Sequence, residues 1–419
     1  MTIKAQQYKV GEDWTSVLFG FLTIFVFLLG LKLPNPNFTW SNADELFNAV
    51  LKMENLINIL ILFFPVYLVS LMGSLLLNKD VKPIAKGFPI VYFLTMLALI
   101  LAGNSFLKSI NLEAVIISLS LGLVLSNIFD IPKWLRDSLS TELFVKIGLV
   151  LLGTTVIFGD ILKAGSLGLV QALLVVLSVW YFAFWLSKKM GIDEEMSLMI
   201  SSAVSICGVS AAIATSGAIK GDSKKLSYVI SLVLITAIPM IMFMPFIAKA
   251  IGLSEAVTGA WLGGTIDTTG AVIASGSLVG EVALQTSTIV KFSQNVLLGL
   301  AAFAISIYWT YTNNQSDVAQ QTKPSLGLIW DRFPKFVIGF MAASLLFSFI
   351  LSAEQINEVK GGLKSIQGLW FALAFTSIGL ETKFSDLFNS EGRKPMYAFL
   401  IAQVFNIFIT LIIAYFLFK

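Results

Sequence analysis

Two stretches of small and polar residues interrupt otherwise apolar segments of the sequence. The first, SICGVSAAIATSG, spans 205–217, and the second, IDTTGAVIASG, spans 266–276. An unpaired backbone N–H or C=O is costly in hydrocarbon, so irregular backbone persists at membrane depth only where it lines a cavity or is packed inside protein. We expect both stretches to unwind into half-helices, whose positive N-terminal ends attract an anion and whose freed carbonyls and hydroxyls suit a cation.

Asp267 is the charged residue in the second stretch, where it stands in the sequence TIDTTG. A carboxylate in the middle of an apolar span is expensive and is therefore usually functional or paired. A carboxylate flanked by threonines and followed by a glycine is typical of a site that coordinates an ion or carries a proton. Close helix packing through small residues is the alternative interpretation of both stretches, and Asp267 favours a site over packing alone.

A third polar group, KFSQN at 291–295, lies early in a later apolar segment. Lys291, Gln294 and Asn295 fall on one helical face because they are three and four residues apart. Lys291 could neutralise Asp267, meet an anionic substrate or extend to the membrane interface. The predicted substrate-binding residues are Ser205, Cys207, Gly208, Val209, Ser210, Thr265, Thr268, Gly270, Lys291 and Asn295, and the predicted ion-coupling residues are Asp267, Thr268 and Thr269.

The elements that must position these residues are membrane-spanning helices. The chain of 419 residues is 57% hydrophobic and only 13% charged, whereas a soluble domain carries about a quarter charged residues. About thirteen apolar segments are long enough to cross the hydrocarbon core. The sequence therefore predicts an all-α polytopic membrane protein of about 11 to 13 transmembrane helices. We expect one domain, 1–419, with a hinge near 313–334 between helix bundles.

The composition also excludes several classes of protein. The sequence contains no histidine, which removes HExxH metalloproteases, Ser-His and Cys-His catalytic pairs and haem ligation by histidine. Its single cysteine, Cys207, allows neither an intrachain disulfide nor a thiolate cluster. It also lacks a GxxxxGK[ST] motif and a basic aromatic stripe, which argues against nucleotide-driven pumping and nucleic-acid binding. We expect no catalytic residue, metal site or cofactor, only a coupling Na⁺ or H⁺.

A weak repeat and the distribution of lysines bear on topology. GTTVIFGDIL at 153–162 resembles GLETKFSDLF at 379–388 in two segments of opposite predicted direction, as an inverted repeat requires, although chance similarity is the alternative. The two broken segments are predicted to be parallel to one another. The balance of Lys and Arg favours a cytoplasmic N-terminus. Lys220, Lys224 and Lys225 argue against that orientation.

Six motifs, in their order along the chain, resemble those of the YeiH family of sulfate exporters, the UPF0324-type bacterial membrane proteins. The motifs are GEDWTSVLFGF, GLVLLGTTV, SICGVSAAIA, GGTIDTTGAVIASG, IVKFSQNVLLG and SIGLETKFSDL. The resemblance covers most of the chain, and its most specific part is the Ile-Cys-Gly-x-Ser-Ala core at 206–211. It implies a transporter of the bacterial inner membrane. The implied fold is an inverted-repeat fold with broken crossing helices, similar to the sodium/proton antiporter and bile-acid symporter folds.

Two residues depart from the pattern expected of this family. Asp267 stands where a histidine is expected, and Gln294 stands where an arginine is expected. Because two potential cations are lost and a carboxylate is gained, the identity of the anion stays open. We expect a secondary active transporter that exports a small anion, such as sulfate, sulfite or an organic sulfonate or carboxylate, coupled to Na⁺ or H⁺ through Asp267. The alternative is a cation/proton antiporter with Asp267 as the exchanged carboxylate. The expected partners are the anion and the lipid bilayer, and a homodimer is left open.

Overall fold

The computed structural model describes residues 11–109, 114–156, 158–312, 330, 333–383 and 393–419. Within these ranges the regular structure is helical, apart from one isolated bridge between Trp40 and Asn104. Eight helical stretches in the described residues are long and apolar enough to cross a membrane, which confirms the all-α polytopic class. They are Met53–Leu76, Val81–Ala102, Lys133–Thr155, Ile161–Lys189, Lys224–Ala250, Glu281–Trp309, Ala353–Glu381 and Arg393–Phe418.

The chain divides into two compact units, which are described separately. Unit 1 comprises Met1–Phe158 and Lys335–Thr382, and unit 2 comprises Gly159–Pro334 and Lys383–Lys419. The predicted hinge at 313–334 lies almost entirely outside the described residues, as does part of the second predicted repeat, 384–388. The main helices of unit 1 are α1 (Glu12–Leu28), α3 (Met53–Leu76), α4 (Val81–Ala102), α6 (Ala114–Ile128), α8 (Thr141–Leu152), α17 (Lys335–Leu345) and α18 (Ala353–Glu381).

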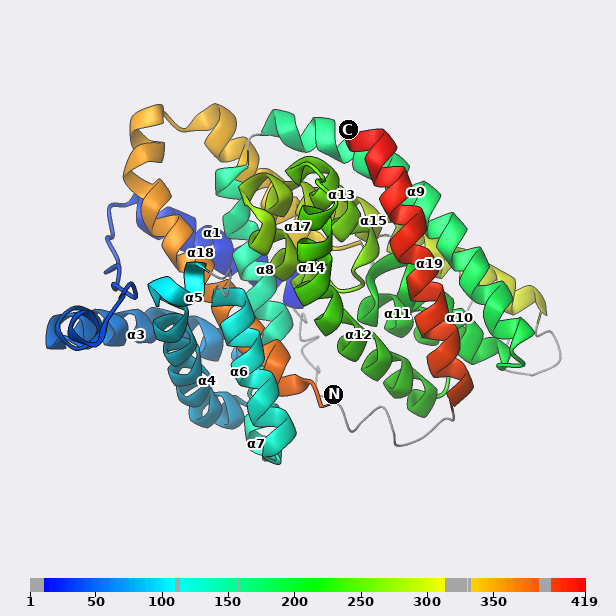
Figure 1. Ribbon diagram of the computed structural model, residues 1–419, viewed down its shortest axis with the longest axis horizontal. Helices are drawn as coiled ribbons and strands as arrows, with labels where there is room; N and C mark the ends of the chain where they lie inside the picture. Colours follow the sequence, from blue (N-terminus) through cyan, green and yellow to red (C-terminus); the bar gives the residue numbers. More distant parts are fainter. Residues whose placement is uncertain (1–10, 110–113, 157, 313–329, 331–332, 384–392) are drawn as a thin grey trace, which may run out of the picture. The chain divides into compact units, whose positions relative to one another are not determined.

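Unit 1 is organised around α18, which packs against α6 and α8 (Figure 1). Small residues allow α6 and α18 to approach closely, as is common in membrane bundles. A Cβ atom on Gly122 would lie only 2.5 Å from the carbonyl oxygen of Thr376. Near the end of α18, the hydroxyl of Ser126 donates to the carbonyl oxygens of Gly379 and Thr382 at 2.9 and 2.8 Å. The N–H of Thr382 also donates to the carbonyl oxygen of Gly379 at 3.3 Å, and the bonds from Ser126 join α6 to this end of α18.

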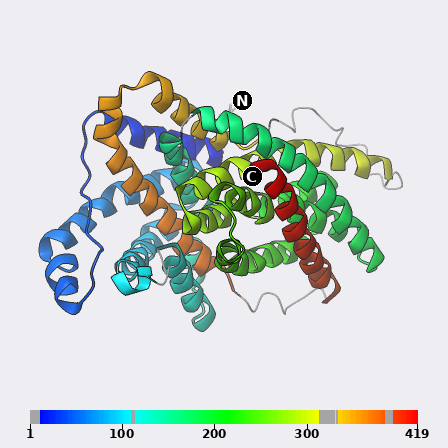
Figure 2. The same ribbon diagram turned by 45° about the horizontal axis from the view of Figure 1, so that its top comes forward.

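Unit 2 combines long helices with two pairs of short ones. Figure 2 shows the ribbon of α19, in red, beside that of α9. The ring of Phe182 in α9 stacks on Phe405 in α19, with centroids 4.1 Å apart. The long helices are α9 (Phe158–Lys189), α12 (Ser223–Ala250), α15 (Glu281–Thr312) and α19 (Arg393–Phe418). The short elements are α10 (Glu194–Ser202), η3 (Ala203–Cys207), α11 (Val209–Ile219), α13 (Glu255–Thr265) and α14 (Thr269–Val279).

The first broken segment returns to the end of unit 2 from which it starts. Lys225, just after this segment, donates to Asp193 and Glu195 at its beginning, at 2.7 and 3.0 Å. A Cβ atom on Gly221 would lie 2.4 Å from the methyl group of Met199. The two arms, α10 and α11, also pack against each other. We call α10, η3 and α11 hairpin 1.

The second broken segment has the same re-entrant form. A Cβ atom on Gly280, directly after α14, would lie 2.5 Å from the carboxylate of Glu255, the first residue of α13. The arms α13 and α14 pack against each other and against α15. Each arm has 11 residues, or about 16 Å at 1.5 Å per residue, which is half of the hydrocarbon core. We call α13 and α14 hairpin 2.

The two hairpins enter unit 2 from opposite ends. Hairpin 1 ends where α12 begins, hairpin 2 begins where α12 ends, and the 28 residues of α12 extend about 42 Å. The breaks therefore occur where the sequence predicts them, but the prediction of two parallel crossing segments is wrong. The cause is that a hairpin of two half-length arms has the same length and hydropathy as a single span. Lys220, Lys224 and Lys225 consequently lie at the same end as Lys188 and Lys189.

Candidate functional site

The tips of the two hairpins meet inside unit 2. Gly208 separates η3 from α11 and has a φ of 58°, which is the left-handed region that favours glycine. A Cβ atom at this position would lie 2.6 Å from Cγ1 of Val233 in α12 and 3.0 Å from Cβ of Asp267. Asp267 lies in the connection between α13 and α14. The glycine therefore provides both the turn at the tip of hairpin 1 and the space for Asp267 of hairpin 2.

Lys291 of α15 joins the carbonyl ends of both hairpins. Its side chain is buried, with 1% of the residue exposed. The ammonium donates to the carbonyl oxygens of Ile206 and Ile266 at 2.7 and 2.9 Å, and to Oε1 of Gln294 at 2.8 Å. A cation is favourable at this place because the carbonyl end of a helix carries partial negative charge. All three N–H groups of the ammonium are used.

Side-chain amides satisfy the remaining carbonyls at the two tips. Gln294 donates to the carbonyl oxygens of Ser205 and Gly264 at 2.8 and 3.2 Å. From α19, Gln403 donates to Thr265 at 3.1 Å. Asn406 donates to the carbonyl oxygens of Val204 and Thr265 at 3.0 and 3.2 Å. The backbone at these breaks is thus stabilised by polar side chains of α15 and α19, as buried irregular backbone requires.

The amino ends of the second arms are the more open part of the tips. No side chain caps the first turn of α11, where Val209 is half-buried and Ser210 is exposed. In α14 the hydroxyl of Thr268 accepts from the N–H of Ala271 at 3.3 Å, and Thr268 and Thr269 are half-buried. Backbone N–H groups at a helix start attract an anion. The two tips therefore combine a closed carbonyl side with an accessible N–H side.

Asp267 is buried between these two sides. Only 1% of the residue is exposed, and Oδ2 has no hydrogen-bond partner among the described residues. The side-chain amide of Gln403 lies beside its carboxyl group. Within the described chain, the ion pairs shorter than 4.0 Å include neither Asp267 nor Lys291. A buried carboxylate with an unpartnered oxygen is unusual in a membrane protein and indicates a functional group.

The structure brings the predicted residues together at the two tips, and several act through the backbone. Ser205 is buried with its hydroxyl donating to Ser201 at 2.7 Å, so its carbonyl makes the contact to Gln294. Asn295 donates to the hydroxyl of Thr269 at 3.3 Å. Cys207, Thr265 and Gly270 are buried. The roles assigned to these residues remain predictions.

Sequence analysis missed the contribution of α19. Gln403, Asn406 and Thr410 recur at intervals of three and four residues in an apolar helix, and all three are buried. Thr410 donates to Oδ1 of Asn406 at 2.8 Å and so orients the amide. Polar residues on one face of a membrane helix are a recognisable signal. Their partners, however, lie about 140 to 200 residues away in the sequence.

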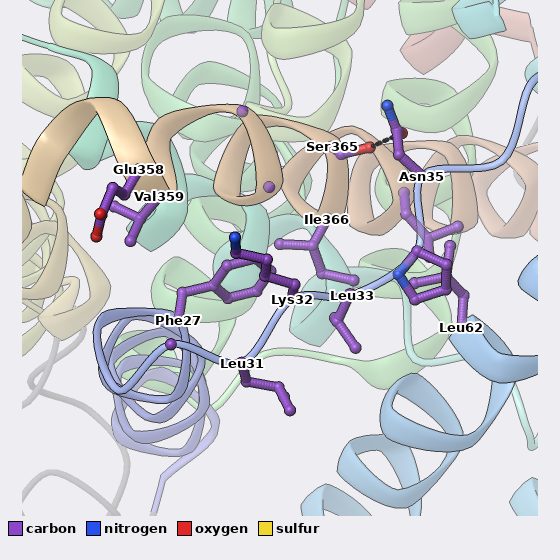
Figure 3. A pocket seen from close by; sticks show the side chains of 15 residues that line it. Phe27, Leu31, Lys32, Leu33, Asn35, Leu62, Glu358, Val359, Ser365 and Ile366 are labelled. Carbon is purple, nitrogen blue, oxygen red and sulfur yellow. Dashed lines mark hydrogen bonds between the residues drawn. The ribbon is translucent and has the colours of Figure 1, made fainter.

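A separate cavity of about 370 Å³ lies in unit 1 and contains none of the predicted site residues. Figure 3 shows Phe27 and Ile366 beside it, and the hydroxyl of Ser365 donating to Oδ1 of Asn35 at 2.7 Å. Lys32 and Glu358 are its charged residues. Its wall is otherwise largely apolar, so the tips in unit 2 remain the candidate functional site.

Comparison with known proteins identifies the family. A family model described as Conserved hypothetical protein 698 matches residues 86–398, which is most of the chain. The chain belongs to this family. It is the YeiH family, so the resemblance of the six motifs is confirmed. No solved structure matches the chain.

Relatives in the YeiH family are named only as membrane proteins. The UPF0324 membrane protein RB9488 of Rhodopirellula baltica is 40% identical over 353 residues, which cover 82% of this chain and 64% of the relative. A UPF0324 membrane protein of Nitratidesulfovibrio vulgaris is 36% identical, with 89% and 65% covered. UPF0324 membrane protein NE0724 of Nitrosomonas europaea is 26% identical, with 92% and 91% covered. The chain spans slightly less than two thirds of the length of each of the first two relatives. Together with its apolar helices, this similarity identifies a multi-pass membrane protein.

Proposed function

We propose that this chain is a secondary active transporter that exports a small anion and is coupled to Na⁺ or H⁺ through Asp267. The candidate anions are sulfate, sulfite and organic sulfonates or carboxylates. One observation carries the proposal: two re-entrant hairpins from opposite ends meet at a buried carboxylate that has an unpartnered oxygen. Broken helices that meet inside a membrane protein are the usual place for a substrate and its coupling ion.

The anion is proposed to bind at the accessible side of the tips. The uncapped N–H groups of Val209 and Ser210 and the hydroxyls of Thr268 and Thr269 supply donors there. These groups bind a negative charge without a mobile counter-ion because the helix start carries partial positive charge. The ammonium of Lys291 adds a full positive charge behind the tips. This combination supports a small anion rather than a bulky apolar substrate.

Two hairpins that enter from opposite ends also provide two gates. Opening of hairpin 1 would expose the tips to one end of unit 2, and opening of hairpin 2 would expose them to the other. The end that carries the base of hairpin 1 is rich in lysine, so the positive-inside rule favours the cytoplasm for that end. We therefore propose that hairpin 1 is the cytoplasmic gate in a bacterial inner membrane.

A cation/proton antiporter without an anionic substrate is the second candidate. It is favoured by one observation, the unpartnered oxygen of Asp267 in a buried position, because an exchanged carboxylate must bind and release a cation. Transport driven by a pH gradient in the absence of sulfate, sulfite, sulfonates and carboxylates would favour this candidate. An enzyme is disfavoured because the tips hold one carboxylate and the sequence has no histidine.

The proposed function is tested with purified protein in liposomes. Uptake of labelled sulfate, sulfite, ethanesulfonate and succinate is measured with a Na⁺ gradient, a pH gradient or neither. We expect gradient-driven uptake of at least one of these anions. Asp267→Ala should reduce that uptake about tenfold or more, because it removes an interaction made in the coupled step. Glu354→Ala, at an exposed position in α18, is the matched control.

Two outcomes would contradict the proposal. Absence of flux for every anion in this set under both gradients would remove the transport function for these classes. Wild-type flux in Asp267→Ala would remove the coupling role of that residue. Thermal unfolding in detergent checks that the variant is folded, and a bound anion should raise the melting temperature in proportion to ln(1 + [L]/Kd).

A further inference from the structure

The hairpin tips enclose two ionisable side chains of opposite sign. Lys291 and Asp267 each have 1% of their surface exposed. The ammonium donates all of its three N–H groups to oxygen atoms, at 2.7 to 2.9 Å. With both groups ionised, the enclosed charges sum to zero. Any further charge that enters this buried space needs compensation, because isolated buried charge is strongly unfavourable.

Lys291 occupies the place where a coupling cation would otherwise be held. Unwound carbonyls and half-helix carbonyl ends are the groups that coordinate Na⁺ in transporters with broken helices. Here those carbonyls, from Ile206 and Ile266, already surround the ammonium, and the neighbouring ones bind Gln294, Gln403 and Asn406. The lysine is therefore a cation tethered to the protein.

Among the titratable groups at the tips, an ionised Asp267 is the one that can take up a proton, because an ammonium and a neutral thiol already carry theirs. Lys291 faces Asp267 from α15, and the thiol of Cys207 in η3 lies near Lys291. The neighbouring residues Val233 and Met240 of α12 and Gln403 of α19 do not titrate. Oε1 of Gln403 is buried and has no partner among the described residues. A protonated carboxyl is a donor and this amide oxygen is an acceptor, so Gln403 can serve both charge states of Asp267.

We propose that each singly charged anion is bound and moved together with one proton on Asp267, while Lys291 takes the place of a coupling Na⁺. This inference rests on the proposed function and specifies its coupling ion. The anion adds one negative charge at the amino ends of α11 and α14, and protonation of Asp267 removes one. The enclosed charge is then zero in both the empty and the loaded state. No further ion is needed to balance the enclosed charge.

The same balance of enclosed charges distinguishes between substrates. A sulfonate or bisulfite carries one negative charge and is balanced by one proton, whereas sulfate carries two and leaves one uncompensated. We therefore expect monoanions to be preferred over sulfate. Because anion and proton move in the same direction, export requires an outward anion gradient that exceeds the inward proton gradient.

Proton uptake on binding tests the inference without any transport assay. Methanesulfonate is the probe because it keeps a single charge throughout the working pH range. It is added to the solubilised protein in weak buffer with a pH indicator, and binding is followed in parallel by calorimetry. We expect about one proton taken up per methanesulfonate bound. Asp267→Asn should still bind methanesulfonate but take up none, and Glu354→Gln, an exposed matched control, should behave as wild type.

Flux in liposomes then separates proton from sodium coupling. An inward proton gradient should accelerate uptake of labelled methanesulfonate at least fivefold, and replacement of Na⁺ by choline should have no effect. If wild-type protein binds methanesulfonate without taking up a proton, the inference is overturned. It is also overturned if methanesulfonate flux depends on the Na⁺ gradient and not on pH. In both cases the transporter proposal survives. Proton-linked binding with no flux supports the link between binding and protonation of Asp267, and it overturns the transporter proposal. If methanesulfonate, sulfate, sulfite and succinate all fail to bind wild-type protein, both proposals are wrong.

Discussion

At the scale of single residues, the tips depend on one glycine and one lysine. Gly208 has no side chain and a positive φ, which lets the tip of hairpin 1 contact Asp267 and Val233. Lys291 donates to both tips and is the charged side chain among those that join them. The sequence indicates both residues, since each stands in an otherwise apolar segment. Their partners could not be predicted, because they depend on which carbonyls the folded hairpins expose.

Substitution of Gly208 by alanine should destabilise unit 2. The new Cβ would lie 2.6 Å from Val233 Cγ1, and alanine is also strained at this φ. We expect a loss of about 1–3 kcal/mol in the free energy of unfolding, from overpacking and backbone strain together. The measurement is thermal and denaturant unfolding in detergent. Gly165→Ala is the control, because its nearest contact would be 3.9 Å away; equal stability of the two variants would contradict the geometry of the tip.

At the scale of elements, hydropathy alone could not predict the two hairpins. The sequence locates the breaks, because glycine, serine and threonine cluster there. It does not reveal that α10 and α11, or α13 and α14, fold back, because two half-length arms resemble one span. The contacts that decide this question join residues on separate segments, such as Lys225 with Asp193 and Gly280 with Glu255. Side chains of α19 then complete the tips from a distant part of the sequence.

The base of hairpin 1 should make a small, pH-dependent contribution to stability. Burial raises the pKa of Asp193, but hydrogen bonds from Lys225 and from the N–H of Met196 outweigh it and hold the pKa below its ordinary value. A carboxyl with a lowered folded-state pKa stabilises the fold above its unfolded pKa, and this stability is lost as pH falls through the folded-state pKa. Half of the Asp193 side chain is exposed (50%), so screening limits the contribution to less than about 1 kcal/mol.

Asp193→Asn tests this contribution at the hairpin base. The variant should melt below wild type at neutral pH and approach it as pH falls below the ordinary aspartate range, near 4. Asp44→Asn, an exposed residue of unit 1, is the control for general effects of charge. Asparagine can still cap α10, so a difference between Asp193→Asn and wild type that does not change with pH would show that the charge of Asp193 contributes nothing.

At the scale of the whole molecule, the hairpins determine which loops share a compartment. If the broken segments crossed the membrane, Lys189 and Lys220 would lie on opposite sides. Because hairpin 1 is re-entrant, we predict that both lie on the cytoplasmic side. Ser254 and Val282, at the base of hairpin 2, should lie on the other side, since α12 separates the two ends by about 42 Å. All four positions are exposed, so cysteines placed there are accessible to a reagent.

Labelling with a membrane-impermeant maleimide tests which of these positions share a compartment. Lys189→Cys and Lys220→Cys should react in inside-out vesicles and not in intact spheroplasts, and Ser254→Cys and Val282→Cys should show the reverse. The background is low because the sequence has one cysteine, Cys207, which is buried. Opposite labelling of Lys189→Cys and Lys220→Cys would restore the crossing arrangement. The tips would then no longer be gated from both ends, since alternating access through two hairpins requires that their bases face different compartments.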